Sequence, residues 1–350
     1  MAKYQIHEIT TQYNHAGSKA TADIFNICNQ LGFIEESLVM YSNKPGIYNK
    51  LMRQIYFMRG WKNAYQSITN NSIVVLQHPF HYPQINRDKI LKKLKEKKNV
   101  KFISVVHDVQ NLRTNDPDPY YKNEFQTMLN IADILIVHNK QMYDYFRKIG
   151  VDEKKLVVLN IFDYLIKDNI TSKPTFSKDI VIAGNLDSNK CEYLKGINKV
   201  KANFELYGPN YNDNINKSNN IHYNGSFPPD QLPKVLNKGF GLVWDGKSVD
   251  TCDGAFGQYL KYNNPHKLSL YLASGLPVII WDEAAEAKFV KENKVGILVH
   301  SLHDVENIFS CLKQEDYDQL AFNAAVIGKK LQNGDFFRAA LMDALARLGG

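Results

Sequence analysis

The sequence predicts an α/β fold built from two doubly wound, Rossmann-like domains whose sheets face a common cleft. Short apolar, β-branched runs alternate with amphipathic segments along most of the chain, which is typical of βαβ units. One polar stretch, residues 167–178 (KDNITSKPTFSK), interrupts this alternation near the middle and has the composition of a linker. At 350 residues the chain is long enough for about two domains. These observations predict one domain on each side of the linker.

The expected first domain spans residues 1–166. Its expected strands are 4–9, 38–41, 72–77, 100–106, 133–137 and 155–159, and its expected helices are 19–31, 48–67, 85–97, 124–132 and 140–149. In the first of these helices Ile24, Ile27 and Leu31 recur at helical spacing and form an apolar face. Because strands that alternate with helices pair in parallel through helical crossovers, the pattern predicts a parallel sheet covered on both faces.

The expected second domain spans residues 176–332 and repeats this alternation. Its expected strands are 179–183, 204–207, 220–223, 239–244, 276–281 and 296–299, and its expected helices are 192–200, 229–238, 265–274 and 284–292. The tail from residue 309 to residue 348 is expected to be helical, with residues 333–350 packing back onto the first domain. Open parallel sheets bind ligands beyond the carboxyl ends of their strands, so two such sheets predict a cleft between those ends.

Residues 263–281 (NNPHKLSLYLASGLPVIIW) are the most informative part of the chain. Pro265 suits the first turn of a helix because it lacks an amide hydrogen that would go unbonded there. Leucine and tyrosine side chains follow at helical spacing, a Ser-Gly pair ends the helix, and a short apolar strand comes next. Asn264, His266 and Lys267 stand at the helix N-terminus beside its unbonded amides. This arrangement predicts a binding site for an anion.

The composition is that of an ordinary globular protein, with 44% hydrophobic and 23% charged residues. The chain starts without an apolar signal core, and no run approaches the roughly 18 apolar residues that span a membrane. The cysteines are scattered and form no CxxC pair, which argues against a disulfide framework or a zinc site. They are Cys28, Cys191, Cys252 and Cys311. We therefore expect a cytoplasmic protein with free thiols.

The net charge of +7 includes a lysine cluster at residues 89–101 (KILKKLKEKKNVK). Ile90, Leu91 and Leu94 give this segment a helical apolar edge beneath a solvated lysine face. Such a patch can contact nucleic acid or an anionic membrane surface. Because no aromatic or arginine residue is interleaved among the lysines, a solvated helix face is the favoured interpretation, and no nucleic-acid partner is expected.

Two short motifs match known patterns but lack the structural context that those patterns need. Residues 241–248 (GLVWDGKS) satisfy the phosphate-binding P-loop pattern, yet the expected strand lies inside the loop instead of before it. Residues 116–119 (DPDP) contain the paired aspartates that hold a divalent metal in some transferases, but two prolines in four residues indicate a turn and a helix entry. No G-x-G-x-x-G follows the first strand, so no nicotinamide or flavin is expected. We expect neither a bound metal nor an organic cofactor.

Polar residues follow most of the expected strands, where a cleft would lie. After the first strand, for example, Gly17 allows close backbone approach to a ligand and Ser18 is suited to cap a helix. The candidates in the first domain are Gly17, Ser18, His78, His107, Asp108 and Arg113, and those in the second domain are Asn185, Tyr207, Ser226, Asp245 and Lys247. All of them fall on the same edge of a sheet, which simple caps and turns do not require.

Several strings of the sequence resemble a bacterial family of two-domain, GT-B glycosyltransferases. They are residues 241–246 (GLVWDG), 262–267 (YNNPHK), 273–279 (ASGLPVI), 106–109 (VHDV) and 183–186 (AGNL). The family includes the third glycosyltransferase of serine-rich-repeat adhesin glycosylation, which adds glucose to protein-linked N-acetylglucosamine, and sequences labelled galactofuranosyltransferases. The resemblance spans both halves of the chain. It implies a UDP-sugar donor and a glycan or glycoprotein acceptor.

The resemblance and the chemistry of transfer together suggest a role for each candidate residue. The expected donor-binding residues are Gly17, Ser18, Asn185, Tyr207, Ser226, Asp245, Lys247, Asn264, His266 and Lys267, the last three at the diphosphate. His107 and Asp108 are the leading pair for the catalytic base, and His78 and Arg113 are expected to bind the acceptor. Many retaining GT-B enzymes carry glutamates where this chain has Asn263 and Leu270, so their absence favours an inverting reaction. Lys267 and the helix amides are expected to replace a metal ion.

Three points stay open at this level. The sugar is expected to be glucose or a related hexose, and a galactofuranosyltransferase of polysaccharide synthesis is an alternative. A non-catalytic GT-B-like partner subunit is a second alternative. A homo-oligomer, either a dimer or a tetramer, is expected because the helical tail is richer in apolar residues than an interdomain latch needs. Those residues are Leu320, Phe322, Val326, Ile327, Leu331, Phe336, Phe337, Leu341 and Leu345.

Overall fold

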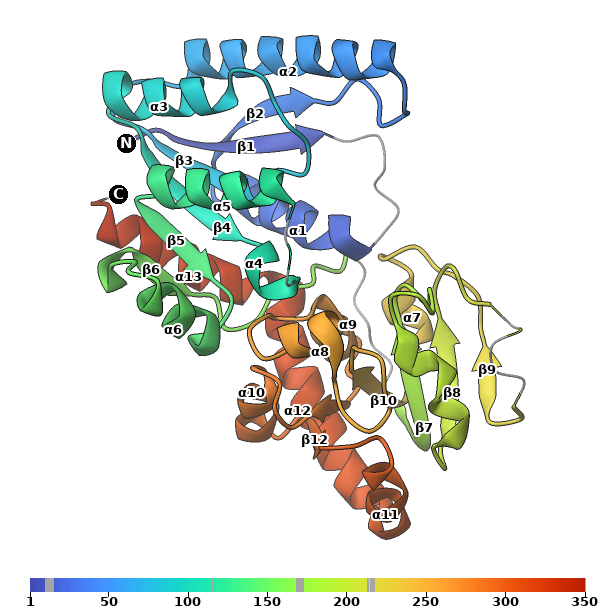
Figure 1. Cartoon of the computed structure of the whole chain (residues 1–350). Helices are drawn as coiled ribbons and strands as arrows, with labels where there is room; N and C mark the ends of the chain where they lie inside the picture. The colour runs from blue at the N-terminus through green and yellow to red at the C-terminus, as the bar shows by residue number, and fades with distance from the viewer. Residues whose placement is uncertain are drawn as a thin grey trace.

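The computed structural model describes residues 1–9, 16–114, 116, 118–167, 173–212, 214 and 218–349. In this part of the chain two six-stranded sheets form, with the strand orders β2-β1-β3-β4-β5-β6 and β12-β11-β10-β7-β8-β9. The strands of both sheets pair in parallel. Figure 1 shows the first domain at upper left and the second at lower right. The prediction of two doubly wound domains is confirmed.

The first domain contains the sheet of strands β1 to β6. The strands are β1 (Lys3–Ile9), β2 (Ile34–Val39), β3 (Ile73–His78), β4 (Lys101–Val106), β5 (Ile134–Val137) and β6 (Leu156–Val158). The helices are α1 (Ala16–Gln30), α2 (Ile47–Ser67), α3 (Arg87–Lys98), α4 (Gln110–Arg113), α5 (Pro119–Ile131) and α6 (Lys140–Lys148), with a 3-10 turn η1 (Glu153–Lys155).

The second domain contains the other sheet, and the two last helices follow it. The strands are β7 (Thr175–Ala183), β8 (Asn203–Tyr207), β9 (Ile221–Tyr223), β10 (Lys238–Val243), β11 (Val278–Trp281) and β12 (Gly296–Val299). The helices are α7 (Leu232–Val235), α8 (Gly254–Tyr259), α9 (His266–Ala273), α10 (Ala287–Asn293), α11 (Asp304–Cys311), α12 (Gln314–Asn333) and α13 (Asp335–Arg347), with 3-10 turns η2 (Glu192–Lys195) and η3 (Ile197–Lys199).

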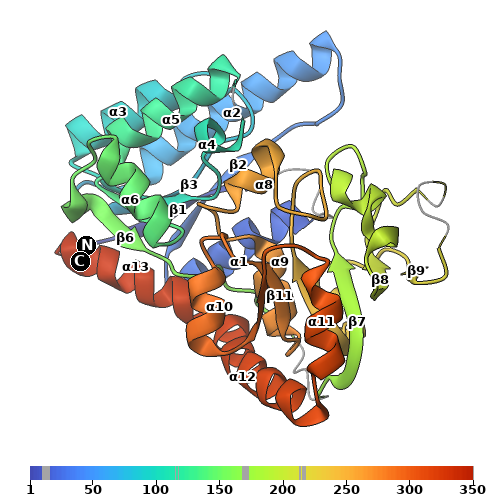
Figure 2. The ribbon, with the colours of Figure 1, turned by 60° about the horizontal axis from the view of Figure 1, so that its bottom comes forward.

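Helices cover both faces of the first sheet. On one face α2, α3 and α5 bury Phe57, Leu91 and Ile131 in one apolar cluster. On the other face α1 and α13 bury Ile27 and Leu341 in a second cluster. The C-terminal helix therefore crosses from the second domain and packs on the first (Figures 1 and 2). Apolar burial of this kind, on the order of 25 cal/mol per Å², is the main force that holds such layers together.

Helix α9 lies in the core of the second domain, with every residue from 268 to 273 buried. Gly241 of β10 makes this close packing possible, because a Cβ there would lie 2.1 Å from Cγ of Tyr271. The Tyr271 hydroxyl accepts a hydrogen bond from the amide of Ala183 at 2.8 Å. Near the start of α9, Ser269 Oγ donates a hydrogen bond to the carbonyl of Phe162, in the first domain, at 2.6 Å. The start of α9 is thereby fixed at the boundary between the domains.

The helical tail uses most of its apolar residues inside the protomer. Leu331, Phe337, Leu341 and Leu345, for example, are buried. Phe322 remains 62% exposed, and it is joined on the surface of α12 by Val326. The exposed surface around Phe322 and Val326 is what remains for contact between protomers, and the homo-oligomer stays a prediction.

A few boundaries differ from the sequence prediction for physical reasons. The strand expected at 38–41 is β2, an edge strand with mostly exposed side chains, so its polar sequence gave no apolar signal. The helix expected over 192–200 is the two turns η2 and η3, because Gly196 between them weakens a helix. The helix expected over 229–238 is reduced to α7, since Lys238 already pairs in β10. The expected linker is shorter, because β7 begins at Thr175.

The P-loop-like residues 241–248 and the Asp-Pro residues 116–119 lack the structure that their motifs need, as the sequence predicts. Strand β10 runs to Val243 and so occupies the would-be P-loop. Asp118 is the N-cap of α5 and its carboxylate accepts a hydrogen bond from the amide of Tyr120 at 2.7 Å, with Pro119 as the first helical residue. Among the described residues no helix has both the length and the apolar character that crossing a bilayer requires.

Candidate active site between the domains

The carboxyl ends of the two sheets border one region, and each sheet has a point there at which the strand order reverses. This point lies between β1 and β3 in the first sheet and between β7 and β10 in the second. Open α/β sheets bind their ligands beyond the strands at such points. The loops that leave β4, β7 and β10 carry His107, Asn185 and Asp245, and His78 is the last residue of β3. The candidate site is therefore built from these loops and from the start of α9.

Lys267 supplies a positive charge at the first turn of α9. Its Nζ donates to the carbonyl of Trp244 at 2.8 Å and lies 3.5 Å from Oδ2 of Asp245. Burial is the largest single influence and opposes the charge, but the attractions of Asp245, Cys191 and Tyr271 together hold the pKa of Lys267 above its ordinary value. The side chain remains 20% exposed. Pro265 is the N-cap, and its carbonyl accepts from the amide of Leu268 at 2.9 Å. The amides of His266 and Lys267 precede this bond and, with the cation, suit a diphosphate.

His266 adds a neutral imidazole beside this cation. Its ring lies 5.2 Å from the ring of Tyr164 and 6.2 Å from that of Phe162. Burial, reinforced by the nearby charge of Lys19, lowers the pKa of His266 to about 4. Its Nε2 is buried and has no hydrogen-bond partner among the described residues. An unpaired buried nitrogen is costly, so this atom is suited to meet a polar group of a ligand.

Asn264 was expected at the diphosphate, and the structure corrects this. Its amide hydrogen is donated to Nδ1 of His138 at 2.9 Å, and its side chain donates to the carbonyls of His138 and Asn160. Its Oδ1 accepts from Nδ2 of Asn139 at 2.7 Å. With only 5% of its surface exposed, Asn264 has no group left for a ligand. It instead joins the second domain to the first.

His138 and Asn139 are the first-domain half of this junction, and the sequence analysis missed them. His138 donates from Nε2 to the carbonyl of Val106 at 2.9 Å, which leaves Nδ1 free to accept from Asn264. Burial lowers the pKa of His138 to about 4 and keeps it in this neutral form. Asn139 caps α6 and also donates to the carbonyl of Tyr262. Both residues directly follow β5, so the rule applied to the other strand ends would have found them.

His107 is a neutral imidazole directly after β4. Its Nε2 donates to Oε1 of Gln77 at 2.7 Å, and the Gln77 amide is oriented by its own bond to the carbonyl of Thr21. This leaves the lone pair of Nδ1 as the acceptor. The imidazole stacks on the ring of Phe162, with centroids 5.4 Å apart. Burial, with His138 as the next cause, lowers the pKa of His107 to about 3.

Asp108 is held more tightly than His107. Nη1 of Arg113 donates to its carboxylate at 3.0 Å, and the guanidinium of Arg113 lies 5.3 Å from the ring centroid of Phe256 in the second domain. The Tyr259 hydroxyl accepts from the amide of Val109 at 2.9 Å and shares a hydrogen bond with Asp108. Burial raises the pKa of Asp108 against the opposing effect of Arg113. These contacts dock the loop that carries Asp108 on α8.

Lys19 is a second buried cation that the sequence analysis missed. Its Nζ donates to Oδ1 of Asp23 and to the carbonyl of Leu165, each at 2.6 Å. It also lies 3.6 Å from Asp230 of the second domain and 4.9 Å from the ring centroid of Tyr164. Burial raises the pKa of Asp23 to about 6. Lys19 is buried because the second domain packs against the start of α1. A lysine near a helix start has no local sequence pattern that predicts such burial.

Two other predicted site residues are too deeply buried to face a ligand. Tyr207, expected at the donor, lies in the core of the second domain with its ring 6.2 Å from that of Phe227. His78, expected at the acceptor, is 2% exposed, and neither ring nitrogen has a hydrogen-bond partner among the described residues. Burial lowers its pKa to about 3. Both residues end a strand, and the last side chain of a strand often points into the layer instead of beyond it.

The remaining donor candidates lie at the predicted edge. Asn185 is exposed after β7 and accepts hydrogen bonds from Asn210 and from the amide of Asp187. Ser226 is exposed after β9, and Lys247 is exposed after β10. Gly17 and Ser18 belong to the first turn of α1, and their side chains, like all of residues 10–15, are outside the described part of the chain.

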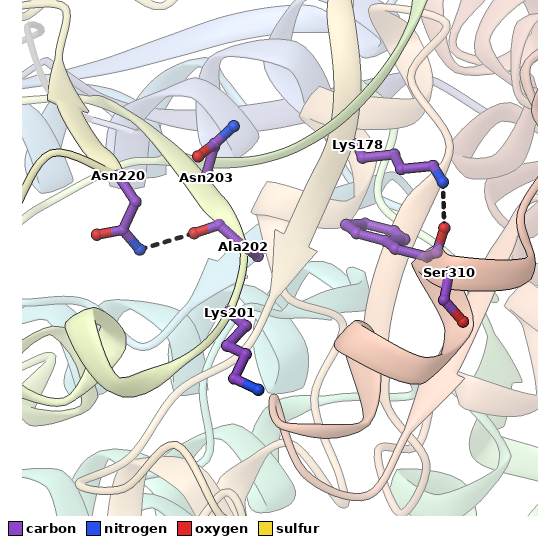
Figure 3. A pocket seen from close by; sticks show the side chains of 7 residues that line it. Lys178, Lys201, Ala202, Asn203, Asn220 and Ser310 are labelled. Carbon is purple, nitrogen blue, oxygen red and sulfur yellow. Dashed lines mark hydrogen bonds between the residues drawn. The ribbon is translucent and has the colours of Figure 1, made fainter.

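A surface pocket of about 510 Å³ lies elsewhere, next to the first residues of β8 (Figure 3). Its lining residues are Lys178, Lys201, Ala202, Asn203, Asn220, Phe309 and Ser310. Lys178 donates to the carbonyl of Phe309, and Lys201 pairs with Glu306 at 2.8 Å. Because this pocket is at the amino-terminal ends of the strands and its lysines are engaged, it is separate from the site described above.

Comparison with known proteins identifies the family. Residues 3–161 match the family described as glucosyltransferase 3-like, N-terminal domain, and residues 180–344 match glucosyltransferase 3-like, C-terminal domain. The β-1,6-galactofuranosyltransferase WbbI of Escherichia coli K12 is 31% identical over 349 residues, which cover 98% of each chain. The chain belongs to the glucosyltransferase 3-like family. Among the relatives of this glycosyltransferase is glucosyltransferase 3 of Streptococcus gordonii, 27% identical over 350 residues that cover 96% of this chain and 97% of the relative.

Solved structures share the fold of this glycosyltransferase. Sucrose-phosphate synthase from Thermosynechococcus elongatus superimposes with a TM-score of 0.64 at 12% identity, covering 99% of this chain and 98% of the other. HepE from Anabaena, solved in complex with UDP and glucose, has a TM-score of 0.61 at 12% identity, covering 98% and 99%. At these identities the likeness concerns the fold alone, and that fold is GT-B.

Proposed function

We propose that this glycosyltransferase moves a hexosyl group from a UDP-sugar to a hydroxyl of a glycan acceptor, with inversion and without a metal ion. The observation that carries the proposal is a pair of unlike groups at the domain boundary. Lys267 contributes a cation from the second domain, and His107 contributes a neutral imidazole from the first. Phe162 lies between their loops, in contact with both His107 and His266. The complex of HepE with UDP and glucose, on the same fold, supports the donor class.

The transfer needs one base and one stabiliser of negative charge. The acceptor hydroxyl attacks the anomeric carbon, the bond from that carbon to the phosphate oxygen breaks, and UDP leaves with the electron pair. The hydroxyl proton goes to Nδ1 of His107, the nitrogen that its contact with Gln77 leaves free. Lys267 and the amides at the start of α9 stabilise the charge that grows on the diphosphate. An arriving diphosphate also favours protonated imidazole, which counteracts the low pKa of His107.

Two arguments support inversion. This chain has Asn263 and Leu270 where many retaining GT-B enzymes carry glutamates. The name of WbbI specifies a β linkage, which is the product of a single displacement on an α-linked donor. Product analysis by NMR checks this directly, since the anomeric coupling constant distinguishes the two configurations. An α-linked product from an α-linked donor contradicts the proposal.

The donor sugar is proposed to be glucose, and the acceptor an N-acetylglucosamine-bearing serine-rich-repeat glycoprotein. Glucosyltransferase 3 of S. gordonii supports glucose. A specific observation favours a second candidate, because WbbI, a galactofuranosyltransferase, is 31% identical. The test offers UDP-glucose, UDP-galactose and UDP-galactofuranose with and without an N-acetylglucosaminyl peptide or a free glycan, and it measures UDP release. Acceptor-dependent release from one donor decides between the candidates.

The proposal that no metal takes part is supported by Lys267 and the amides at the start of α9, which supply positive charge for a diphosphate. We expect activity to survive excess EDTA. Loss of activity with restoration by manganese would contradict this. In the part of the chain that the structure describes, the cluster Asp282, Glu283 and His300 would then be examined first. Asp118 is a weaker candidate, since its carboxylate already caps α5.

A non-catalytic partner subunit is the alternative from another functional class. Binding of UDP distinguishes it only in part, so two measurements are needed. At about 100 times its dissociation constant a ligand adds about 2.7 kcal/mol of stability, which a thermal shift detects easily. Stabilisation by UDP together with UDP release from a donor supports the enzyme. Stabilisation without release from any donor and acceptor supports the partner subunit.

A further inference from the structure

Helices α2 and α3 form one strongly positive face of the first domain. Helix α2 contains four Lys and Arg residues and no Asp or Glu, and α3 contains seven Lys and Arg against two Asp and Glu. The two helices therefore hold more net positive charge than the +7 of the whole chain. They lie next to each other at the outer side of the first sheet, at the top of Figure 1.

Most of these cations are available to a partner. Four are engaged inside the domain: Arg53 donates to the carbonyl of Ser42, Arg87 pairs with Glu124, Lys95 pairs with Asp133, and Lys98 donates to two backbone carbonyls. Lys92 is exposed and lies 3.8 Å from Glu96 of the same helix. Six others are exposed, and in the described ranges none of these six forms an ion pair with a carboxylate. They are Lys50, Arg59, Lys62, Lys89, Lys93 and Lys97. The positive charge is thus mainly unpaired and faces solvent.

An exposed apolar stripe runs through this face. Ile47, Leu51 and Met58 are spaced four and seven residues apart, which places them on one side of α2. Ile47 is 87% exposed and Leu51 is 58% exposed. Ile85 is also exposed, and its amide donates to Gln54 of α2, so it lies beside the others. We call Ile47, Leu51, Met58 and Ile85 the α2 stripe.

We propose that the α2 stripe and the surrounding cations bind the surface of a bilayer that contains anionic lipids. Apolar side chains enter the boundary between head groups and acyl chains, and lysines meet the lipid phosphates. Nucleic acid matches the charge but leaves the apolar stripe in water. A second copy docked through the same face matches the stripe but brings like charges together. An anionic bilayer matches both features.

The position of the α2 stripe relates membrane binding to the candidate active site. Helix α2 begins shortly after the carboxyl end of β2, so Ile47 lies at the same edge of the first sheet as the candidate site. Adsorption through this end of α2 turns the cleft toward the lipid surface, where lipid-borne glycans are found. The proposal goes beyond sugar transfer and does not depend on it, because vesicle binding and turnover are measured separately.

The test is sedimentation of the full chain with vesicles of phosphatidylcholine alone or mixed with phosphatidylglycerol. We expect binding to the mixed vesicles only, and weaker binding at high salt. Near an anionic surface each lysine changes binding about fivefold. The triple variant K89Q/K93Q/K97Q should therefore bind about 100-fold more weakly. The matched control K195Q/K199Q/K291Q, with the same change of charge on exposed lysines of the second domain, should bind like the wild type.

A second pair of variants tests the apolar component. I47S/L51S should weaken vesicle binding about tenfold or more, whereas F322S/V326S, on the exposed side of α12, should not. Exposed side chains contribute little to folding, so all these proteins should keep the wild-type melting temperature. Equal binding to neutral vesicles, or equal losses in test and control variants, would overturn the proposal. Tighter binding to duplex DNA than to vesicles, or dimers by light scattering that I47S/L51S abolishes, would do the same.

Discussion

The carboxyl edges of the two sheets have the same architecture and opposite chemistry. On the first sheet, burial lowers the pKa of His107 to about 3 and that of His138 to about 4, so both imidazoles are neutral. On the second sheet, Lys267 is also partly buried, yet its pKa is raised. The edge of the first sheet includes His107, which keeps one ring nitrogen free to accept a proton, and we call it the proton-accepting edge. The edge of the second sheet includes the cation of Lys267, and we call it the cationic edge. The fold supplies the edge, and the residues that follow each strand decide what the edge does.

The difference arises from the partners of each group. Lys267 stands beside the carboxylate of Asp245, and this attraction, together with those of Cys191 and Tyr271, exceeds the cost of burial. His107 has only a neutral amide, a phenyl ring and other imidazoles around it, so nothing offsets burial. Equal burial therefore produces opposite shifts. A site that joins both edges can hold a diphosphate on one side and receive a proton on the other.

The largest expected effect tests the proton-accepting edge. H107A should lower turnover by roughly 10²–10⁴-fold, with UDP affinity nearly unchanged, because it removes the base and not the anion site. D108N should lower turnover less, since Arg113 and Tyr259 keep its loop in place. Steady-state kinetics and calorimetry with UDP measure the two quantities. Near-normal turnover in both variants would exclude the pair and move the search to His81 and His15.

The next effect tests the cationic edge. K267A should weaken binding of UDP about 10- to 100-fold, because a charge-assisted hydrogen bond contributes about 1.5–3 kcal/mol. K291A is the matched control, since Lys291 is an exposed lysine of α10 and is not among the candidate site residues. Titration calorimetry compares the two variants. Equal affinities for UDP in wild type and K267A would remove Lys267 from the donor site.

A third effect tests the junction between the edges. N264A removes three side-chain hydrogen bonds at a buried position, so we expect it to lower the free energy of unfolding by about 1–3 kcal/mol. N185A, at an exposed position, should change it by less than about 0.5 kcal/mol. Urea denaturation measures both. If N264A is as stable as N185A but binds UDP more weakly than the wild type does, Asn264 belongs to the donor site after all.

The smallest expected effect concerns a proton held at the same junction. Glu286 is buried, shares a hydrogen bond with Asn139, and has its pKa raised by burial from 4.5 to about 8. The folded state therefore keeps a proton that the unfolded state has lost, and stability due to this group falls as the pH rises from 4.5 to 8. The free energy of unfolding of wild type minus that of E286Q should fall by about 1 kcal/mol from pH 6 to pH 7.

E283Q is the control for this comparison. Glu283 is exposed and bonded to Lys261, and its pKa is lowered, so it stays ionised throughout that range. The difference between wild type and E283Q should therefore be independent of pH from 6 to 7. A difference for E286Q that is equally flat would mean that Glu286 is ionised in the folded protein.

The sequence by itself determined the fold and the place of the cationic edge. Apolar runs with alternating helices predicted both parallel sheets, and only polar or glycine-containing segments such as β2 and residues 192–200 were misjudged. Pro265 and Gly275 predicted the start and end of α9, and therefore the position of Lys267 at its first turn. These features depend on neighbours within a few residues, so local pattern is sufficient to predict them.

The tertiary structure alone decided which of the polar residues face the cleft. Asn264 and Lys267 are three residues apart and carried the same prediction, yet Asn264 is used by His138 and Asn139 of the other domain. His78 and Tyr207 end strands as expected but turn into buried layers. The hydrogen-bond partners of Asn264 lie more than a hundred positions away in the sequence, and no local pattern records them. For the same reason, the unpaired charge and the exposed apolar stripe of α2 become visible only after folding has buried everything around them.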